Sequence, residues 1–390
     1  MLSAYLLALF AVKGVFIPVV ALGLVGITAF YSRPIAKRYV IVVGGLIAWG
    51  AASAYWSLDA DHTLLTAFKL LMLTTLGTLA IRNIAAEEKP IEAGIVLGAS
   101  LAALALLVLS LPVDSIQEKV LSMRKGISSF NNGANFLSVM IWPAIFVAWR
   151  QYGAVVAACI LVIGVAALYL SDSDAATFSM AIAGLGFLGT RILPRSLIKV
   201  IAVLLGLTSL ASPLIVKNYL NPEVAFTKFK PLFNQTSHQH RIYILDQYTK
   251  RSFEQPVLGH GLGASKVFHK DRDFSEDQEL WRILTTLSTN TKDVNIAGNS
   301  LHAHNMSIQV WFELGAVGAT LLALLLTMLM WDISNLQSMR QRQLGVILMG
   351  TTLAIAHTSH SSVQTWWLAS IMLAVFGFFT FKHIDDTKNT

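Results

Sequence analysis

Apolar segments long enough to cross a bilayer recur along almost the whole chain, and they restrict the possible folds more than any other feature. A helix needs about 20 apolar residues to span a hydrocarbon core about 30 Å thick, and within lipid every backbone polar group must be paired inside the protein. The composition agrees, because 55% of the 390 residues are hydrophobic and 13% are charged. We therefore predict an all-α polytopic membrane protein with about twelve transmembrane helices, or eleven if residues 1–31 form one helix. The predicted segments are 2–12, 15–31, 39–56, 63–81, 91–111, 133–149, 153–170, 175–190, 197–213, 305–331, 344–358 and 362–381.

The distribution of Lys and Arg predicts the orientation, because positive charge is retained on the cytoplasmic side of short loops. With both termini inside, the loops "SLDADHT", "SDSD" and "HTSHSS" lie outside and contain no Lys or Arg. One outer loop, "DSIQEKVLSMRKGISSFNNGAN", is an exception with Lys119, Arg124 and Lys125. The basic residues predicted on the inner face are Arg33, Lys37, Arg38, Arg82, Lys89, Arg150, Arg191, Arg195, Lys199, Arg340, Arg342, Lys382 and Lys388.

A long polar segment divides the chain into three regions: an N-terminal transmembrane bundle at 1–215, a large outer loop with surface helices at 216–300, and C-terminal transmembrane helices at 301–390. A connection of this length usually forms a functional lid or a small domain. Within "HRIYILDQYTKRSFEQ", Ile244 and Tyr248 recur with Leu245 at helical spacing. This pattern predicts a helix lying along the membrane surface, ending at Pro256.

The next stretch, "PVLGHGLGAS", carries Gly259, Gly261 and Gly263. Glycine adopts backbone angles closed to other residues, so this spacing suits a tight turn with a close backbone approach. It is not a dinucleotide fingerprint, because no βαβ unit surrounds it.

Two histidines stand at the mouth of a predicted span, in "SLHAHNMSIQVWFELGAVG". At 100° per residue, His302 and His304 point to nearly opposite sides of a helix, so they do not form an i, i+4 metal clamp. His304 shares a stripe with Gly315, and small residues let a second helix approach, so we expect His304 to face the bundle. The alternative is an interfacial histidine that caps the helix or meets lipid headgroups.

Three motifs together resemble the O-antigen ligase and O-antigen polymerase family. They are Arg241 with Leu245, the Pro-x-x-Gly-x-Gly-x-Gly turn from Pro256, and His304-Asn305 separated by nine residues from Gly315. A weaker match is "RKGISSFNNGANFLSVMIWP".

The chain departs from this family at "SDSDAATF", where Asp174 stands in place of an expected Arg. This departure puts a phosphate-binding role at that position in doubt. Asp172 and Asp174 either orient a cation or a sugar hydroxyl, or they cap the following helix.

The resemblance implies a GT-C-like glycosyltransferase of the bacterial inner membrane, multi-pass, with its active site facing the periplasm. The implied donor is a glycan on undecaprenyl pyrophosphate. A ligase, which we favour, transfers it to lipid A-core oligosaccharide, and a polymerase transfers it to another lipid-linked unit. Membrane lipids are expected partners and nucleic acid is not. A transporter or flippase is the alternative from another class, but its usual internal repeats and broken helices near the midplane are not predicted.

The implied chemistry assigns roles to the singled-out residues. His304 would accept the proton of the acceptor hydroxyl. Arg241 and Arg124 would grip the pyrophosphate, with Lys125 and the intramembrane Lys69 as further cations. Attraction to anionic lipid headgroups is the alternative for these cations. No cofactor or metal is expected, so transfer should persist in excess EDTA. Direct displacement at the anomeric carbon would invert its configuration. The supporting residues are Asn305, His302, Asp174 and Gly315.

Overall fold

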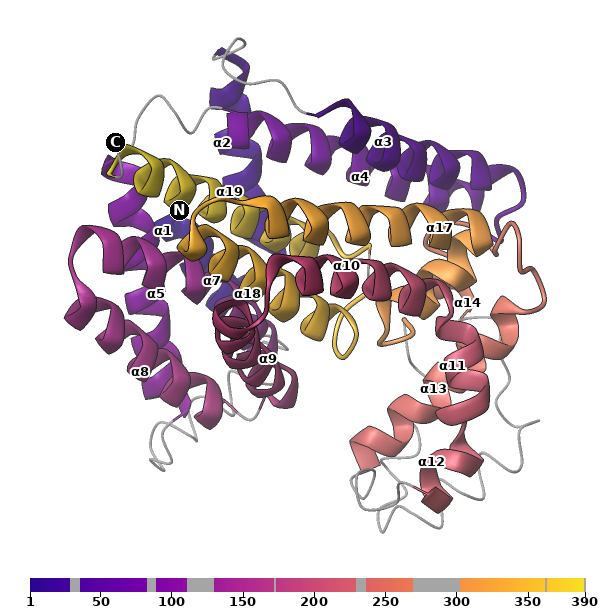
Figure 1. The fold of residues 1–390 in the computed structure, drawn as a ribbon. Helices are drawn as coiled ribbons and strands as arrows, with labels where there is room; N and C mark the ends of the chain where they lie inside the picture. Colours follow the sequence, from indigo (N-terminus) through magenta and orange to yellow (C-terminus); the bar gives the residue numbers. More distant parts are fainter. Residues whose placement is uncertain are drawn as a thin grey trace.

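The computed structural model describes residues 1–28, 36–82, 89–110, 130–171, 173–228, 236–268, 302–361 and 363–388, and its regular elements there are all helices (Figure 1). The N-terminal part contains α1 (Leu2–Phe10), η1 (Val12–Val15), α2 (Phe16–Thr28), α3 (Lys37–Ala52), η2 (Ser53–Tyr55), α4 (Ala60–Arg82), α5 (Lys89–Ser110), α7 (Phe130–Gln151), α8 (Ala154–Leu170), α9 (Asp174–Ile192) and α10 (Arg195–Leu210). The remainder contains α11 (Ser212–Tyr219), α12 (Pro222–Lys228), α13 (Thr236–Ser252), α14 (Ser265–Phe268), α17 (Met306–Asn335), α18 (Met339–Ala356) and α19 (Thr365–Thr387).

Helix α7 is the centre of the bundle. In the most apolar 18-residue stretch of α7, 89% of the residues are buried inside the protein, against 22% in the corresponding stretch of α3. Helix α7 is therefore surrounded by protein, and α3 lies at the periphery. Pro143 lies within α7 and packs on α19 at Gly377, where a Cβ would come within 2.8 Å of the proline ring. In the turn before this proline, the carbonyl of Met140 accepts a hydrogen bond from the Tyr5 hydroxyl at 3.0 Å. The largest buried side chains of the core come from α1, α7 and α19, including Phe136, Trp367 and Phe381.

The predicted membrane spans are confirmed in part. Each of the twelve predicted segments contains a described helix, and among the described residues seven helices are long and apolar enough to cross a membrane, or eight if α10 and α11 form one bent span. The other five helices are shorter or more polar: α1 has nine residues, α2 has 13, α8 has 17 and α10 has 16, and α18 carries Arg340 and Arg342 in its first turn. The chain is a multi-pass membrane protein with a helical bundle.

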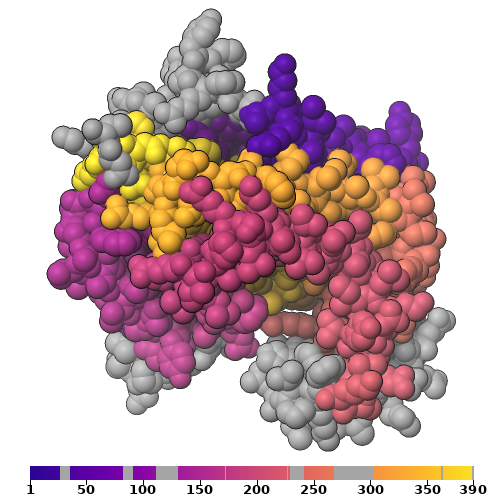
Figure 2. Space-filling view, viewed as in Figure 1, coloured from indigo at the N-terminus to yellow at the C-terminus, as the bar shows by residue number. Residues whose placement is uncertain are grey.

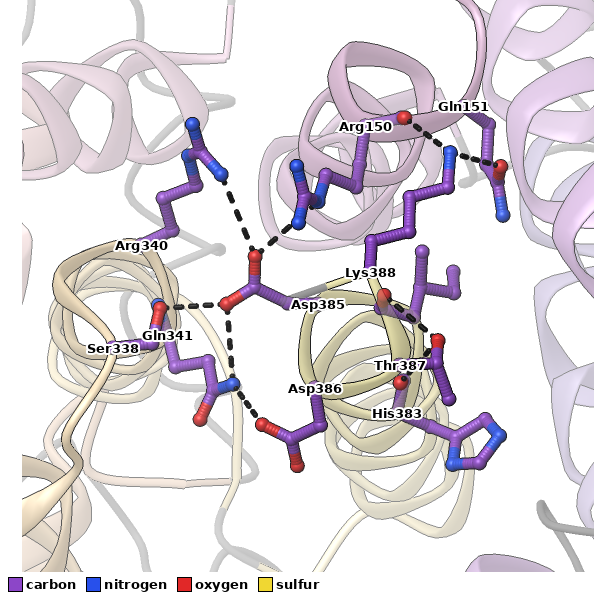
Figure 3. A network of polar contacts seen from close by, with 11 residues as sticks. Arg150, Gln151, Ser338, Arg340, Gln341, His383, Asp385, Asp386, Thr387 and Lys388 are labelled. Carbon is purple, nitrogen blue, oxygen red and sulfur yellow. Dashed lines mark hydrogen bonds and ion pairs between the residues drawn. The ribbon is translucent and has the colours of Figure 1, made fainter. Parts of the chain in front are cut away.

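Basic residues that the sequence assigns to one face do meet at one end of the bundle. Arg38 at the start of α3 donates to Asp332 near the end of α17 at 2.7 Å. Asp385 in α19 is fully buried and lies 3.5 Å from Arg150 of α7 and 3.6 Å from Arg340 of α18 (Figure 3). The start of α3 thus meets the end of α17, and the start of α18 meets the ends of α7 and α19. The predicted topology places these five helix ends on the same side, and the contacts agree with it.

The opposite end of the bundle carries α11, α12 and α13, which project from it (Figures 1 and 2). Helix α11 leaves α10 at an angle of 69°, and Pro213 in its first turn suits this change of direction because proline is tolerated at a helix start. The surface is hollowed where these helices project, and the segment between α18 and α19 lies near this hollow (Figures 1 and 2).

Candidate functional site

A break in α17 organises the end of the bundle that carries α11, α12 and α13 (Figure 1). Gly315 has φ +61° and ψ −160°, so the helix is interrupted nine residues after its start. The sequence-based expectation of a continuous helix with Gly315 on a stripe facing another helix is therefore wrong. The sequence did not predict this break in α17. A backbone carbonyl within lipid needs a partner, so the carbonyls freed by the break must be satisfied by other parts of the protein.

The glycine turn supplies most of those partners. The carbonyls of Phe312 and Glu313 accept from the amides of His260 at 2.9 Å and Gly261 at 2.8 Å, and the amide of Ala316 donates to Pro256 O at 2.8 Å. The third freed carbonyl, that of Leu314, accepts from the indole of Trp49 at 3.0 Å. The turn thus replaces the missing helical hydrogen bonds.

The glycines of this turn are required by geometry, as the sequence predicts. Gly259, Gly261 and Gly263 have φ of +72°, +105° and +79°, a region that L-residues rarely adopt. A Cβ on Gly259 would lie 2.5 Å from the backbone of Glu313, and one on Gly315 would lie 2.2 Å from the carbonyl oxygen of Val257. The two parts of the motif are therefore in backbone contact, although more than fifty residues separate them.

Helix α13 is fixed against the first half of α17. The ring of Tyr248 meets Phe312 edge-on with centroids 4.9 Å apart, and Ile244 lies in the same buried cluster with Ile308 and Ala303. The helix predicted from the apolar spacing exists, but it ends at Ser252, before Pro256, and its apolar side packs on protein where the sequence suggested the membrane surface. This packing holds Arg241 close to the start of α17.

His304 lies outside the helix that follows it. Asn305 caps α17, its Oδ1 accepting from the amide of Ile308 at 3.1 Å, and His304 has φ +50°. The helical-wheel argument for His304 therefore fails, because it assumed a helical backbone at this residue. A non-glycine residue with positive φ costs about 1–3 kcal/mol and is typical of functional sites.

The two histidines form a pair with distinct roles. Their ring centroids are 4.1 Å apart, and the backbone amide of His304 donates to Nδ1 of His302 at 3.2 Å. Because Nδ1 accepts, the proton of a neutral His302 ring sits on Nε2. Burial and then the positive charge of Arg241 lower the pKa of His302 to about 4, so this ring is neutral near pH 7.

Arg241 and Asp174 approach each other from α13 and α9. Burial lowers the pKa of the Arg241 guanidinium, and the negative charge of Asp174 opposes that shift. The cap of α9 is Ser173, whose Oγ accepts from the amide of Ala176 at 3.4 Å. The prediction that Asp174 caps this helix is thus wrong. It lies in the first turn and acts on Arg241 electrostatically.

A buried relay of hydrogen bonds reaches His360, which the sequence reasoning missed. Ser173 Oγ donates to Asn135 Oδ1 at 3.1 Å, and Asn135 Nδ2 lies 2.9 Å from His360 Nε2. Burial, followed by the charge of His302, lowers the pKa of His360 to about 3. The segment between α18 and α19 therefore brings a third imidazole close to His302. The sequence signal was available, since "HTSHSS" places two histidines in an outer loop.

The other predicted site residues are placed differently. Lys69 lies on an exposed face of α4 beside Phe68 and Leu65, which are 58% and 49% exposed. Its side chain therefore points away from the bundle interior, so the expected meeting of Lys69 with Arg241 is not supported. The predicted cations Arg124 and Lys125, together with Asp172, lie outside the described residues.

The arrangement suits recognition of an anion and movement of a proton. A half-buried guanidinium binds phosphate oxygens strongly, and a neutral imidazole accepts a proton. In the described part of the chain, no three His, Cys, Asp or Glu side chains are grouped so as to hold a metal ion.

Glu313 is a further polar residue that the sequence reasoning missed. An acidic side chain within a span was the available signal.

Comparisons with known proteins agree with these motifs. Residues 159–323 match the family model described as O-Antigen ligase, a range that contains the glycine turn, the histidine pair and the break in α17. A Rickettsia conorii protein named "Putative polysaccharide ligase" is 25% identical over 327 residues, covering 83% of this chain and 75% of the relative. Proteins with the same description from Rickettsia typhi and Rickettsia prowazekii are each 23% identical, covering 83% of this chain and 76% of each relative.

Proposed function

We propose that the chain joins a glycan from undecaprenyl pyrophosphate to lipid A-core oligosaccharide, because residues 159–323 match the O-antigen ligase family model. The proposed location is the periplasmic face of a bacterial inner membrane. The observation that supports the proposal is the His302–His304 pair at the start of α17, with ring centroids 4.1 Å apart, and the positive charge of Arg241 acts on His302.

Arg241 is proposed to bind the donor pyrophosphate. Its guanidinium can form two parallel hydrogen bonds to phosphate oxygens, and partial burial strengthens such a contact. The negative charge of Asp174 partly offsets the positive charge of Arg241 before the donor arrives. The polyprenyl tail of the donor would lie along the apolar faces of the bundle.

His304 is proposed to be the general base. Its ring takes the proton of the acceptor hydroxyl, the hydroxyl oxygen forms a bond to the anomeric carbon, and the bond from that carbon to the pyrophosphate oxygen breaks. The leaving group departs as undecaprenyl pyrophosphate, whose charge Arg241 stabilises. Direct displacement inverts the anomeric carbon. His302 holds the backbone of His304 through its Nδ1 and stays neutral, which keeps the pair from repelling Arg241.

A transporter is less well supported. Broken helices in transporters leave unwound backbone groups to coordinate their solutes. Here the freed carbonyls of residues 312–314 accept from the glycine turn and from Trp49, so this backbone is occupied by the protein itself.

One assay separates the candidate functions. Detergent-purified protein is given a lipid-linked glycan together with lipid A-core or a second lipid-linked unit, without ATP. A product on lipid A-core supports a ligase, a lengthened lipid-linked glycan supports a polymerase, and no joined product rejects both. The same assay in excess EDTA is expected to give undiminished product, and loss that Mg²⁺ or Mn²⁺ restores would contradict a metal-independent mechanism.

A further inference from the structure

The mechanism above leaves Glu313 without a role, although it lies close to the break in α17. Its side chain is 1% exposed, and the residue stands two positions before Gly315. A buried carboxylate is costly unless hydrogen-bond donors surround it. Its neighbours therefore indicate what it does.

Donors face both oxygens of this carboxylate. The amide of Gly263 donates to Oε2 at 2.9 Å. Ser265 Oγ and Gln309 Nε2 reach Oε1 at 2.5 Å and 2.8 Å. Three hydrogen bonds from separate segments therefore attach the end of the glycine turn to Glu313, and a buried carboxyl group that lost them would leave its donors unpaired.

These donors come from segments that carry the proposed reaction. Gly263 ends the glycine turn, and Ser265 begins α14. Gln309 lies one turn before Glu313 in α17, and its amide also donates to Ser361 at 2.7 Å, close to His360. Glu313 therefore joins the glycine turn, the first half of α17 and the segment between α18 and α19.

The anchor extends to α13. The carbonyl of Ser265 accepts from the Tyr248 hydroxyl at 3.4 Å, and Tyr248 packs on Phe312, the neighbour of Glu313. Helix α13 is thus attached to α17 at the glycine turn and along its buried side. Arg241 lies about two turns before Tyr248 on the same helix.

We propose that Glu313 is a positioning residue: its carboxylate holds the glycine turn in the break of α17 and so sets the position of Arg241 relative to His304. The inference rests on the proposed function for its catalytic consequence. Glu313 itself contacts neither substrate. A displacement of about 1 Å between reacting groups lowers turnover by about 100-fold, so an anchor outside the site can control the rate.

The test compares three changes with a matched control. Glu313→Ala removes the anchor, Glu313→Gln keeps its volume and one acceptor oxygen, and Ser265→Ala removes one donor. Glu92→Gln is the control, because Glu92 is also buried and also accepts from a glutamine amide, that of Gln151 at 2.7 Å, at the other end of the bundle. Thermal unfolding of all four variants accompanies the kinetics.

The expected result is a fall in kcat with little change in KM for the acceptor. We expect about 100-fold for Glu313→Ala and about 10-fold for Glu313→Gln, since displaced reacting groups lose rate in this range. The double variant of Ser265→Ala with Glu313→Gln should be no slower than Glu313→Gln alone, because both changes act on one contact. Glu92→Gln should keep kcat while its unfolding temperature falls.

Two outcomes would overturn the proposal. One is a Glu313→Ala enzyme with the kcat of the wild type, and the other is a fall in kcat for Glu313→Gln that Glu92→Gln shows equally.

A distance measurement tests the positioning without catalysis. Spin labels at exposed Lys250 on α13 and Thr320 on α17, in a Cys159→Ala background, should give one narrow distance distribution in the wild type. Glu313→Ala should broaden or shift it, and an unchanged distribution rejects the proposal. If the wild type joins no glycan, the proposed function fails while this measurement still decides the role of Glu313.

Discussion

At the scale of single residues, His302 and His304 lie close together, but we expect only His304 to act as the general base. His302 uses Nδ1 to accept from the backbone of His304, and burial beside Arg241 keeps its pKa near 4. We expect His304→Ala to lower transfer by at least about 100-fold, because general-base catalysis contributes about 10²–10⁴-fold, and His302→Ala to lower it by about 10-fold. Product formation per amount of folded protein measures both. Equal, near-normal rates would remove His304 from the mechanism.

Arg241 is expected to depend on its shape as well as its charge. Arg241→Lys keeps a positive charge on α13 but loses the planar fork that grips two phosphate oxygens. Turnover should fall by about 10–100-fold and donor binding should weaken in parallel. Arg251→Lys on the same helix is the control, because Arg251 pairs with exposed Glu254 three residues away. Normal binding and turnover in Arg241→Lys would make Arg241 a lipid headgroup contact.

The buried imidazoles predict an acid-sensitive fold. The folded-state pKa of about 4 for His302 and about 3 for His360 lie below the ordinary histidine value of about 6.5. Below about pH 6.5 the unfolded chain therefore binds more protons at these two histidines than the folded protein does. Their contribution to the free energy of unfolding is complete above about pH 6.5 and is lost as the pH falls toward about 4.

We expect His360→Gln to flatten this pH dependence. The glutamine oxygen can still accept from Asn135, but the side chain does not titrate. Between pH 7 and 5, the wild type should lose about 1–2 kcal/mol more unfolding free energy than the variant. Tryptophan fluorescence during unfolding in detergent at both pH values measures the difference. Parallel pH profiles would contradict the prediction.

At the scale of elements, the break in α17 and the glycine turn form one unit. Gly315→Ala places a Cβ 2.2 Å from the carbonyl oxygen of Val257, at a φ of +61° that alanine rarely adopts. We expect a loss of about 2–4 kcal/mol in unfolding free energy together with loss of transfer, from clash and backbone strain.

The matched control for this change is Gly184→Ala. Gly184 lies in α9, and nothing comes within 4 Å of a Cβ built there. Alanine is favoured over glycine within a helix by about 1 kcal/mol, so this variant should be as stable as the wild type or more so. Two variants with equal thermal stability would show that the break does not need a glycine.

At the scale of the whole molecule, the two ends of the bundle differ in what they do. The end that carries α11, α12 and α13 holds the proposed site (Figure 1). At the other end, Asp385 is fully buried and accepts from Ser338 Oγ at 2.6 Å and from Gln341 Nε2 at 3.2 Å. It also forms ion pairs with Arg150 and Arg340 (Figure 3). This network joins α7, α18 and α19.

Neighbouring aspartates allow a direct test of that end. Asp385→Ala should cost about 2–4 kcal/mol, because it leaves buried donors and charges without their acceptor. Asp386→Ala should cost less than about 1 kcal/mol, since the Asp386 side chain is 52% exposed and its pair with Lys382 is at the surface. KM for both substrates should stay unchanged in each variant. Equal unfolding temperatures for the two would show that burial of Asp385 does not matter.

The sequence by itself determines the helical membrane architecture, the clustering of basic residues at one end and the glycine turn. These features depend on local quantities: apolar length, charge, and the need for glycine where φ is positive. The same local reasoning measures apolar segments without knowing where helices begin and end, so it cannot fix the length of α1 or α8. It also cannot find Ser173 as the cap of α9 in preference to Asp174, since both residue types cap helices well.

Only the tertiary structure decides how α17 is built. A helical wheel assumes one period throughout, so it places Gly315 and His304 on a regular stripe. The break exists because the turn at residues 256–263, distant in sequence, supplies the hydrogen bonds that the helix gives up. The same long-range packing places Arg241 near His302, buries Glu313 among donors and brings His360 to the site. Such partners come from segments far apart in the chain, and no local pattern within one segment specifies them.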